Sequence, residues 1–484
     1  MAEVDLETIK RRSVGGIFAL TSRTFVLQLI SFVATFILTI LLAPSIFGVF
    51  FIVSAVISFL GYFSDVGLAA ALIQKKEEPT ELDLRTTFLI QEFLVGTVVL
   101  IGFFLSKPIA SFYNLSEAGL WLLRALLISF FLSSLKTIPS VILERRLDFN
   151  RLIIPQIVET VLFYLVAIVL AIMGFGIASF AWAALVRGAS GTLLIYYLAP
   201  WSVSISFSKE SAKRLLSFGV PFQLNSFLAL IKDDFMTIFL GKILPFAEVG
   251  YIGWAKKWAE IPLRLVMDNV IKVTFPAYSR LQGNAVYLGK AVEKSLFFIA
   301  ILIFPIVTGL VIFIKPLVFL LPRYQKWEPA LILFYLFSLS AIVSSFSGPL
   351  TNALSAIGKI RITLCLMVMW TVLTWLLVPF LVFKFGYNGV GYGAALLSLT
   401  IFVVLAVVKK YINYSLFPKL IKPSLATLGM LLAVVVFLNL FGSSWLGLVI
   451  SGVGGLLVYG ILILFLARGE ILPEIKDLLM RKSF

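Results

Sequence analysis

The sequence has no histidine and a single cysteine, Cys365, among its 484 residues. Without histidine, the chain cannot use a Ser-His-Asp triad, a histidine general base, or a histidine-ligated zinc or haem. With one cysteine, it can form neither an intrachain disulfide nor a cysteine metal cluster. We therefore expect no metal and no cofactor.

Charged residues are also scarce, at 13% of the chain, where a soluble globular protein has about 25%. Hydrophobic residues make up 61%, and phenylalanine alone contributes 45 residues. A soluble domain of this length would need far more polar surface, so a soluble enzyme is excluded. The apolar runs are continuous rather than alternating, which favours membrane helices over a β-barrel.

The hydropathy pattern predicts an all-α polytopic membrane protein with about 14 transmembrane helices, each of roughly 20 apolar residues. The expected helices run near 13–42, 46–72, 85–106, 119–142, 151–173, 176–199, 213–240, 247–275, 287–314, 329–355, 360–383, 389–409, 422–441 and 445–467.

The basic residues predict the orientation. The formal net charge is +16, and alternate loops carry 25 and six Lys/Arg residues. The positive-inside rule then places both termini in the cytoplasm and requires an even number of spans. We expect a multi-pass protein of the plasma (inner) membrane. This topology explains the basic loops, so no nucleic-acid partner is expected, and no phosphate-binding GxxxxGK[ST] motif is present.

Nine basic and seven acidic residues fall inside the predicted helices, all within the first eight. A charge inside a span costs several kcal/mol or more unless it faces water or a partner. These sixteen charges therefore predict a polar interior between the helices.

Two stretches about 200 residues apart resemble each other. Residues 42–48 and 244–250 each contain a short outer turn with Pro and then Gly, followed by a helix with an acid, Asp65 or Asp268. The repeat predicts two six-helix lobes in a pseudo-two-fold arrangement plus two C-terminal helices. The expected divisions are 1–205, 206–415 and 416–484, with a substrate site between the lobes.

The predicted helix 247–275 carries a charged stripe on one face, because its charges recur at i+3 and i+4. Pro262 should kink this helix. The stripe consists of Lys257, Glu260, Arg264, Asp268 and Lys272. Two interpretations stay open: direct contact with substrate, or a self-neutralising ladder that wets a cavity wall.

Arginine within a span suits a diphosphate, because its planar donors bind two oxygens at once. We therefore interpret Arg23 and Arg187 as cavity cations. The alternative for Arg187 is a structural pair with Glu159 or Glu92. The full predicted substrate-binding set is Arg23, Gln28, Arg187, Lys256, Lys257 and Arg264.

An isolated carboxylate in the membrane can bind a proton or Na⁺ and so couple transport to an ion gradient. The candidates are Asp65, Asp233 and Asp268. The alternative, which we favour, is a salt bridge to Lys232, Arg264 or Lys272.

Several segments resemble the polysaccharide flippases of the multidrug/oligosaccharidyl-lipid/polysaccharide exporter superfamily, which act on O-antigen and exopolysaccharide repeat units. The resemblance lies in Gln28 and in residues 41–48, 65–74, 143–149, 250–255, 275–282 and 354–359. One departure is Ala43, where many relatives have a basic residue.

The resemblance implies a flippase that moves polyprenyl-diphosphate-linked oligosaccharides from the cytoplasmic to the outer leaflet. It implies a V-shaped pair of lobes and alternating access driven by Na⁺, H⁺ or the membrane potential. In related lipid II flippases, arginines on the helices that correspond to those of Arg23 and Arg264 line the cavity. Besides the lipid-linked glycan and the bilayer, it implies a monomer that works with a polysaccharide polymerase and chain-length machinery.

Two other classes of function compete with this prediction. A small-molecule efflux antiporter would need an acidic cavity, whereas the charges inside the predicted helices sum to +2. A membrane polymerase or glycosyltransferase would need large outer loops with catalytic residues, and the predicted outer loops are short. We therefore expect a transporter and no enzyme.

Overall fold

The computed structural model describes residues 6–64, 66–75, 77–224 and 227–473, with side chains from Thr24 onward except at 221, 222, 224, 268 and 269. The described residues contain helices and no strand, which confirms the all-α prediction. The chain divides into two compact units, Met1–Gly253 and Trp254–Phe484, here called the N-terminal and C-terminal units.

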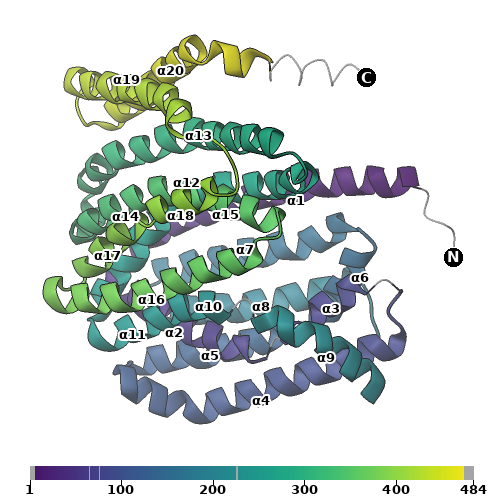
Figure 1. Cartoon of the computed structure of the whole chain (residues 1–484). Helices are drawn as coiled ribbons and strands as arrows, with labels where there is room; N and C mark the ends of the chain where they lie inside the picture. The colour runs from purple at the N-terminus through teal and green to yellow at the C-terminus, as the bar shows by residue number, and fades with distance from the viewer. Residues whose placement is uncertain (1–5, 65, 76, 225–226, 474–484) are drawn as a thin grey trace. The chain divides into compact units, whose positions relative to one another are not determined.

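The N-terminal unit is a bundle of long helices and short helical pieces (Figure 1). In it α4, α5 and α8 lie side by side, and α7 packs against α8 and α1. The helices are α1 (Leu6–Leu41), α2 (Pro44–Tyr62), α3 (Leu68–Gln74), α4 (Glu81–Tyr113), α5 (Glu117–Ser134), α6 (Thr137–Arg145), α7 (Phe149–Ile172) and α8 (Ala178–Leu198).

The prediction of one helix over 46–72 is wrong, because the chain breaks between α2 and α3. Gly67 precedes α3 with φ of +70°, a conformation that side chains with a Cβ rarely adopt. A Cβ at Gly67 would also collide with the carbonyl oxygen of Gly219. Two glycines therefore let the break pack directly against the helix that carries Gly219.

The prediction of one helix over 213–240 is also wrong. This stretch contains α9 (Lys209–Leu224), α10 (Phe227–Leu230), a π-helical turn (Ile231–Phe235) and α11 (Met236–Ile243). The π-turn holds the two adjacent acids, and each has a polar partner. Asp233 pairs with Lys232 at 3.1 Å, and Ser58 donates a hydrogen bond of 3.1 Å to Asp234.

The two turns that the repeat pairs with each other, at 42–48 and 244–250, are in contact inside the N-terminal unit. A Cβ on Gly48 would collide with the carbonyl oxygen of Phe246, and a Cβ on Gly250 would collide with that of Pro44. Gly48 and Gly250 are 202 residues apart, as are Pro44 and Phe246. The contact is therefore reciprocal, and glycine is needed on both sides.

Helix α12 (Phe246–Leu281) is one continuous helix through Pro262 and Pro276, and the boundary between the two units falls within it. The other helices of the C-terminal unit are α13 (Ala285–Leu320), a 3₁₀ turn (Pro322–Ala330), α14 (Leu331–Ser344), α15 (Ser347–Ala356), α16 (Ile360–Phe385), α17 (Asn388–Ser398), α18 (Ile401–Lys409), α19 (Phe417–Phe441) and α20 (Trp445–Leu466). Within this unit α19 and α20 pack against each other and against α13.

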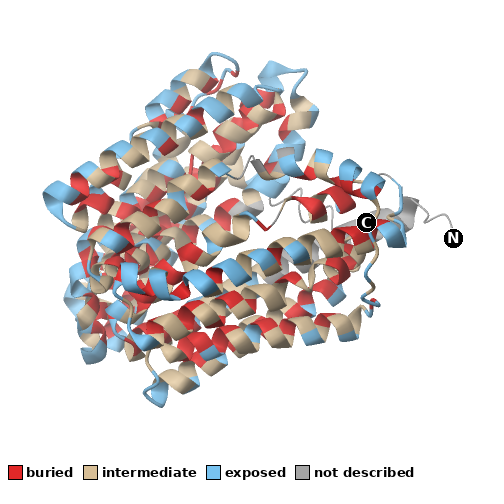
Figure 2. Cartoon of the chain, turned by 90° about the horizontal axis from the view of Figure 1, so that it is seen from below, coloured by how far each residue is buried: buried red, intermediate tan, exposed pale blue. Residues whose placement is uncertain are grey.

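Buried and exposed residues follow opposite faces of single helices, as shown in red and pale blue in Figure 2. Many exposed residues are large and apolar, such as Phe104, Phe383 and Phe465. Such a surface is suited to contact with lipid rather than water.

Twelve helical segments among the described residues are long and apolar enough to cross a membrane. The predicted spans 213–240 and 247–275 are not among them. The first falls on the short pieces from α9 to α11, and the second falls on α12, which carries several charges. The chain is a multi-pass membrane protein.

Candidate functional site

Polar contacts from several helices meet at the junction between α5 and α6 in the N-terminal unit. Its four residues, Ser134 to Thr137, each bond to another helix. The Ser134 hydroxyl lies 2.8 Å from Glu92 of α4, and Thr137 accepts a hydrogen bond of 2.8 Å from Gln91 of α4. The Leu135 carbonyl accepts a hydrogen bond from Tyr196 of α8, and Lys136 pairs with Glu159 of α7. We call Glu92, Ser134–Thr137, Glu159 and Tyr196 the polar hub.

The Lys136–Glu159 pair is tight and largely buried. The ammonium nitrogen lies 2.5 Å from the carboxylate, and the two side chains are 18% and 9% exposed. Gly191 of α8 makes room for the pair, because a Cβ there would collide with Glu159 Oε2. Buried charges are tolerated when they are paired in this way.

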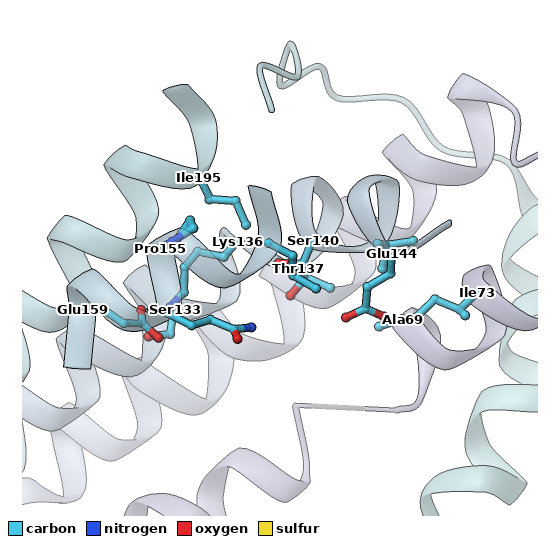
Figure 3. Close-up of a pocket in the computed structure, with 13 residues that line it drawn as sticks. Ala69, Ile73, Ser133, Lys136, Thr137, Ser140, Glu144, Pro155, Glu159 and Ile195 are labelled. Atoms are coloured by element: carbon cyan, nitrogen blue, oxygen red, sulfur yellow. Dashed lines mark hydrogen bonds and ion pairs between the residues drawn. The ribbon is translucent and has the colours of Figure 1, made fainter. Parts of the chain in front are cut away.

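A pocket of about 270 Å³ adjoins the polar hub. Figure 3 shows Lys136 and Glu159 at one side of it and Glu144, Ala69 and Ile73 at the other. Ser133 at the end of α5 and Thr137 and Ser140 of α6 also line it. The pocket is polar enough to hold water beside a charged pair.

Arg187 lies on α8 and is exposed. Its guanidinium stacks over the ring of Phe163 at 5.8 Å. Among the described residues Arg187 forms no ion pair with Glu159 or Glu92; Glu159 pairs with Lys136, and Glu92 contacts Ser134.

Of the other predicted residues, Gln28 and Arg23 belong to α1 and Asp268 belongs to α12. Gln28 is half-buried on α1, which packs against α7, and nearby Ser31 bonds to Tyr164 at 2.6 Å. Asp65 lies outside the described residues, and so do the side chains of Arg23 and Asp268.

The cations of α12 belong to the C-terminal unit. Glu260 lies between Arg264, at 3.2 Å, and Lys256, at 3.9 Å. The Lys256 and Arg264 side chains are 45% and 60% exposed, and Lys257 is half-buried. Glu260 thus lies within ion-pair distance of two cations of the same helix, each one turn away.

Sequence reasoning missed a second ion-pair cluster in the N-terminal unit. Asp83 is fully buried and lies 2.7 Å from Lys75 and 2.6 Å from Arg214 of α9. Asp83 also closes a capping box with Thr80 at the start of α4. Arg145 donates to the carbonyls of Leu72, Ile73, Lys75 and Glu77. The Thr-x-x-Asp pattern at 80–83 was the available signal for the capping box.

Residues 37–331 match the family model described as "Polysaccharide biosynthesis protein". The chain belongs to this family.

Sequence similarity extends to the succinoglycan biosynthesis transport protein ExoT of Rhizobium meliloti (strain 1021). The identity is 24% over 308 residues, which cover 63% of this chain and 61% of that protein. The chain thus spans about three fifths of the length of the curated relatives it matches.

The fold is similar to that of two transporters of known structure. The lipid II flippase MurJ, in an inward closed conformation, has a TM-score of 0.74 at 14% identity, with 93% of this chain and 99% of that chain covered. An inward-facing multidrug transporter of the MATE family has a TM-score of 0.60 at 17% identity, with 79% and 95% covered. At these identities the likeness concerns the fold alone.

Proposed function

We propose that this protein is a flippase that moves polyprenyl-diphosphate-linked oligosaccharide repeat units from the cytoplasmic to the outer leaflet by alternating access. The observation that carries the proposal is membership of the polysaccharide biosynthesis family in a chain with the MurJ fold. The relative ExoT is named a succinoglycan biosynthesis transport protein, which is consistent with a glycan substrate.

The physical task explains the membrane-embedded cations. A diphosphate glycan cannot cross hydrocarbon alone, because transfer of an unpaired charge out of water is prohibitive. Exposed arginines and lysines can replace part of its hydration. Arg187 on α8 and Lys256 and Arg264 on α12 are exposed and so can supply these contacts, with Arg23, Gln28 and Lys257 as the remaining proposed members.

The remaining features of the proposal come from the loop charges and the family. The two repeat-related lobes comprise residues 1–205 and 206–415, and residues 416–484 contain the two C-terminal helices. Both termini lie in the cytoplasm, and the protein is a monomer in the inner membrane. A polysaccharide polymerase and its chain-length machinery act on the delivered repeat unit. Na⁺ or H⁺ drives the cycle, with Asp65, Asp233 and Asp268 as the first coupling candidates.

The test is transbilayer movement of a polyprenyl-diphosphate oligosaccharide in proteoliposomes, with empty liposomes as the control. Protein-dependent movement is expected with at least one glycan. No movement with several glycans, in protein that elutes as a single folded species, would refute the proposal.

The similarity in fold to a MATE transporter suggests a second candidate function, which is cation-coupled efflux of small molecules. The family match and the excess of cations among the helix-embedded charges speak against it. Protein-dependent uptake of a radiolabelled organic cation into the same vesicles, without glycan movement, would favour efflux instead.

A further inference from the structure

The polar hub contains two carboxylates and only one ammonium group. Lys136 is committed to Glu159 at 2.5 Å. Glu92 therefore has no cation partner among the described residues, and its one polar contact is with the buried hydroxyl of Ser134. The hub has one more acidic group than it has cations.

Glu92 lies well inside a membrane-spanning helix. It is eleven residues from Glu81 at the start of α4, which is about 17 Å along the helix axis. Its Oε1 atom is buried and has no hydrogen-bond partner among the described residues. An ionised carboxylate in this position would be solvated by a single hydroxyl, which is far too little to offset its transfer from water.

The hydrogen bonds of Ser134 indicate where a proton resides. The Ser134 Oγ atom lies 2.8 Å from Glu92 Oε2 and 2.7 Å from the carbonyl oxygen of Phe131. A hydroxyl has one hydrogen, and the Phe131 carbonyl can only accept. Both contacts are full hydrogen bonds at once if Glu92 Oε2 carries the hydrogen and donates it to Ser134, which in turn donates to Phe131.

We propose that Glu92 holds one exchangeable proton and is the ion-coupling group of this transporter. Its coupling role rests on the proposed transport function, whereas proton binding does not. The proton moves between Glu92 Oε2 and water, and the pocket beside Lys136 and Thr137 offers water close to the hub. The other titratable groups of the hub are Lys136, Glu159 and Tyr196.

This assignment differs from the sequence-predicted coupling residues. Asp233 pairs with Lys232 at 3.1 Å, so its charge is already compensated. Glu92 lies inside a span, has no cation partner in the part of the chain that the structure describes, and faces a hydroxyl that can accept a hydrogen bond from its proton. These three properties suit a group that is neutral in one conformation and releases its proton in another.

Infrared spectroscopy of the purified protein tests proton binding directly. At pH 7 exposed carboxyl groups are ionised, so a protonated buried acid is identified by its C=O stretch. We expect this band in the wild type and in Glu117→Gln, an exposed control, and we expect it to be lost in Glu92→Gln. Ser134→Ala should keep the band but shift it, because the acid loses its acceptor. A band that persists unchanged in Glu92→Gln, or no shift in Ser134→Ala, would overturn the assignment.

Proteoliposomes test the coupling. One tightly coupled proton shifts the transbilayer distribution of substrate by up to about tenfold per pH unit. We expect such a shift for the wild type and Glu117→Gln, and none for Glu92→Gln, which should still equilibrate substrate. The coupling role would be refuted if the pH-driven shift in substrate distribution survived in Glu92→Gln. It would also be refuted if a Na⁺ gradient, and not a pH gradient, shifted the distribution in the wild type. Absence of any wild-type movement would refute the transport proposal instead and leave the infrared result standing.

Discussion

The Asp83→Ala substitution removes a fully buried carboxylate that two cations share. Asp83 joins α4 to Lys75 at the end of α3 and to Arg214 on α9, and one of its oxygens also accepts the Thr80 backbone N–H. Its loss would leave Lys75, which is only 11% exposed, with a charge and no buried partner. Arg214 is 54% exposed and would be rehydrated.

These exposures set the expected magnitudes. Removing one partner of a buried ion pair costs about 3–5 kcal/mol, and loss of the capping box adds about 1 kcal/mol. Lys75→Met should cost about 2 kcal/mol, because Asp83 keeps Arg214 and its capping bonds. Arg214→Gln should cost at most about 1 kcal/mol, as for other solvent-exposed pairs.

Hydrogen exchange measured by mass spectrometry on peptides covering residues 68–90 reports this local stability. A loss of 3 kcal/mol accelerates exchange through local opening by roughly a hundredfold, and a loss of 1 kcal/mol by about fivefold. We expect the acceleration of exchange to be largest for Asp83→Ala, smaller for Lys75→Met and smallest for Arg214→Gln. Exchange in peptides of α16 and α17 should not change, and it is the internal control. Equal effects of Asp83→Ala and Arg214→Gln would refute the argument that burial decides the strength of these ion pairs.

Three further predictions concern other contacts. Lys136→Met and Glu159→Gln should each destabilise the N-terminal unit by about 3 kcal/mol, and the double variant should recover most of this loss in a detergent unfolding series. Additive losses would contradict a direct pair. Gly250→Val should cost about 1–3 kcal/mol by forcing α2 and α12 apart, and a melting temperature equal to that of the wild type would show that the contact is loose. Arg187→Ala should reduce glycan flipping more than tenfold at unchanged thermal stability, and wild-type flipping would remove Arg187 from the proposed diphosphate site.

The glycine contact shows how far the repeat could be followed from the sequence. The pattern of Pro and then Gly at 44–48 and 245–250 predicts two equivalent outer turns. It does not predict that Gly48 and Gly250 pack against each other, because a sequence repeat specifies similar local structures and not their contact. The reciprocal contact depends on tertiary packing.

The helix breaks show a limit of hydropathy. Residues 46–72 and 213–240 are apolar enough to suggest single helices, yet Gly67 breaks the first and a π-turn at Ile231–Phe235 interrupts the second. The left-handed conformation of Gly67 and the partners of Asp233 and Asp234 become visible only once α2, α3 and the segments from α9 to α11 are packed.

The sequence by itself determined the membrane class, the helical content and the approximate spans. Hydrophobicity acts residue by residue, and the bilayer requires every apolar run to satisfy its own backbone hydrogen bonds. Which charges pair was decided only by the tertiary structure. Glu159 could have met Arg187 or Lys136, and no local sequence pattern specifies which; the structure pairs it with Lys136, while Arg187 lies over Phe163. Among the described residues the same packing brings no cation to Glu92, and its proposed role in carrying a proton depends on this.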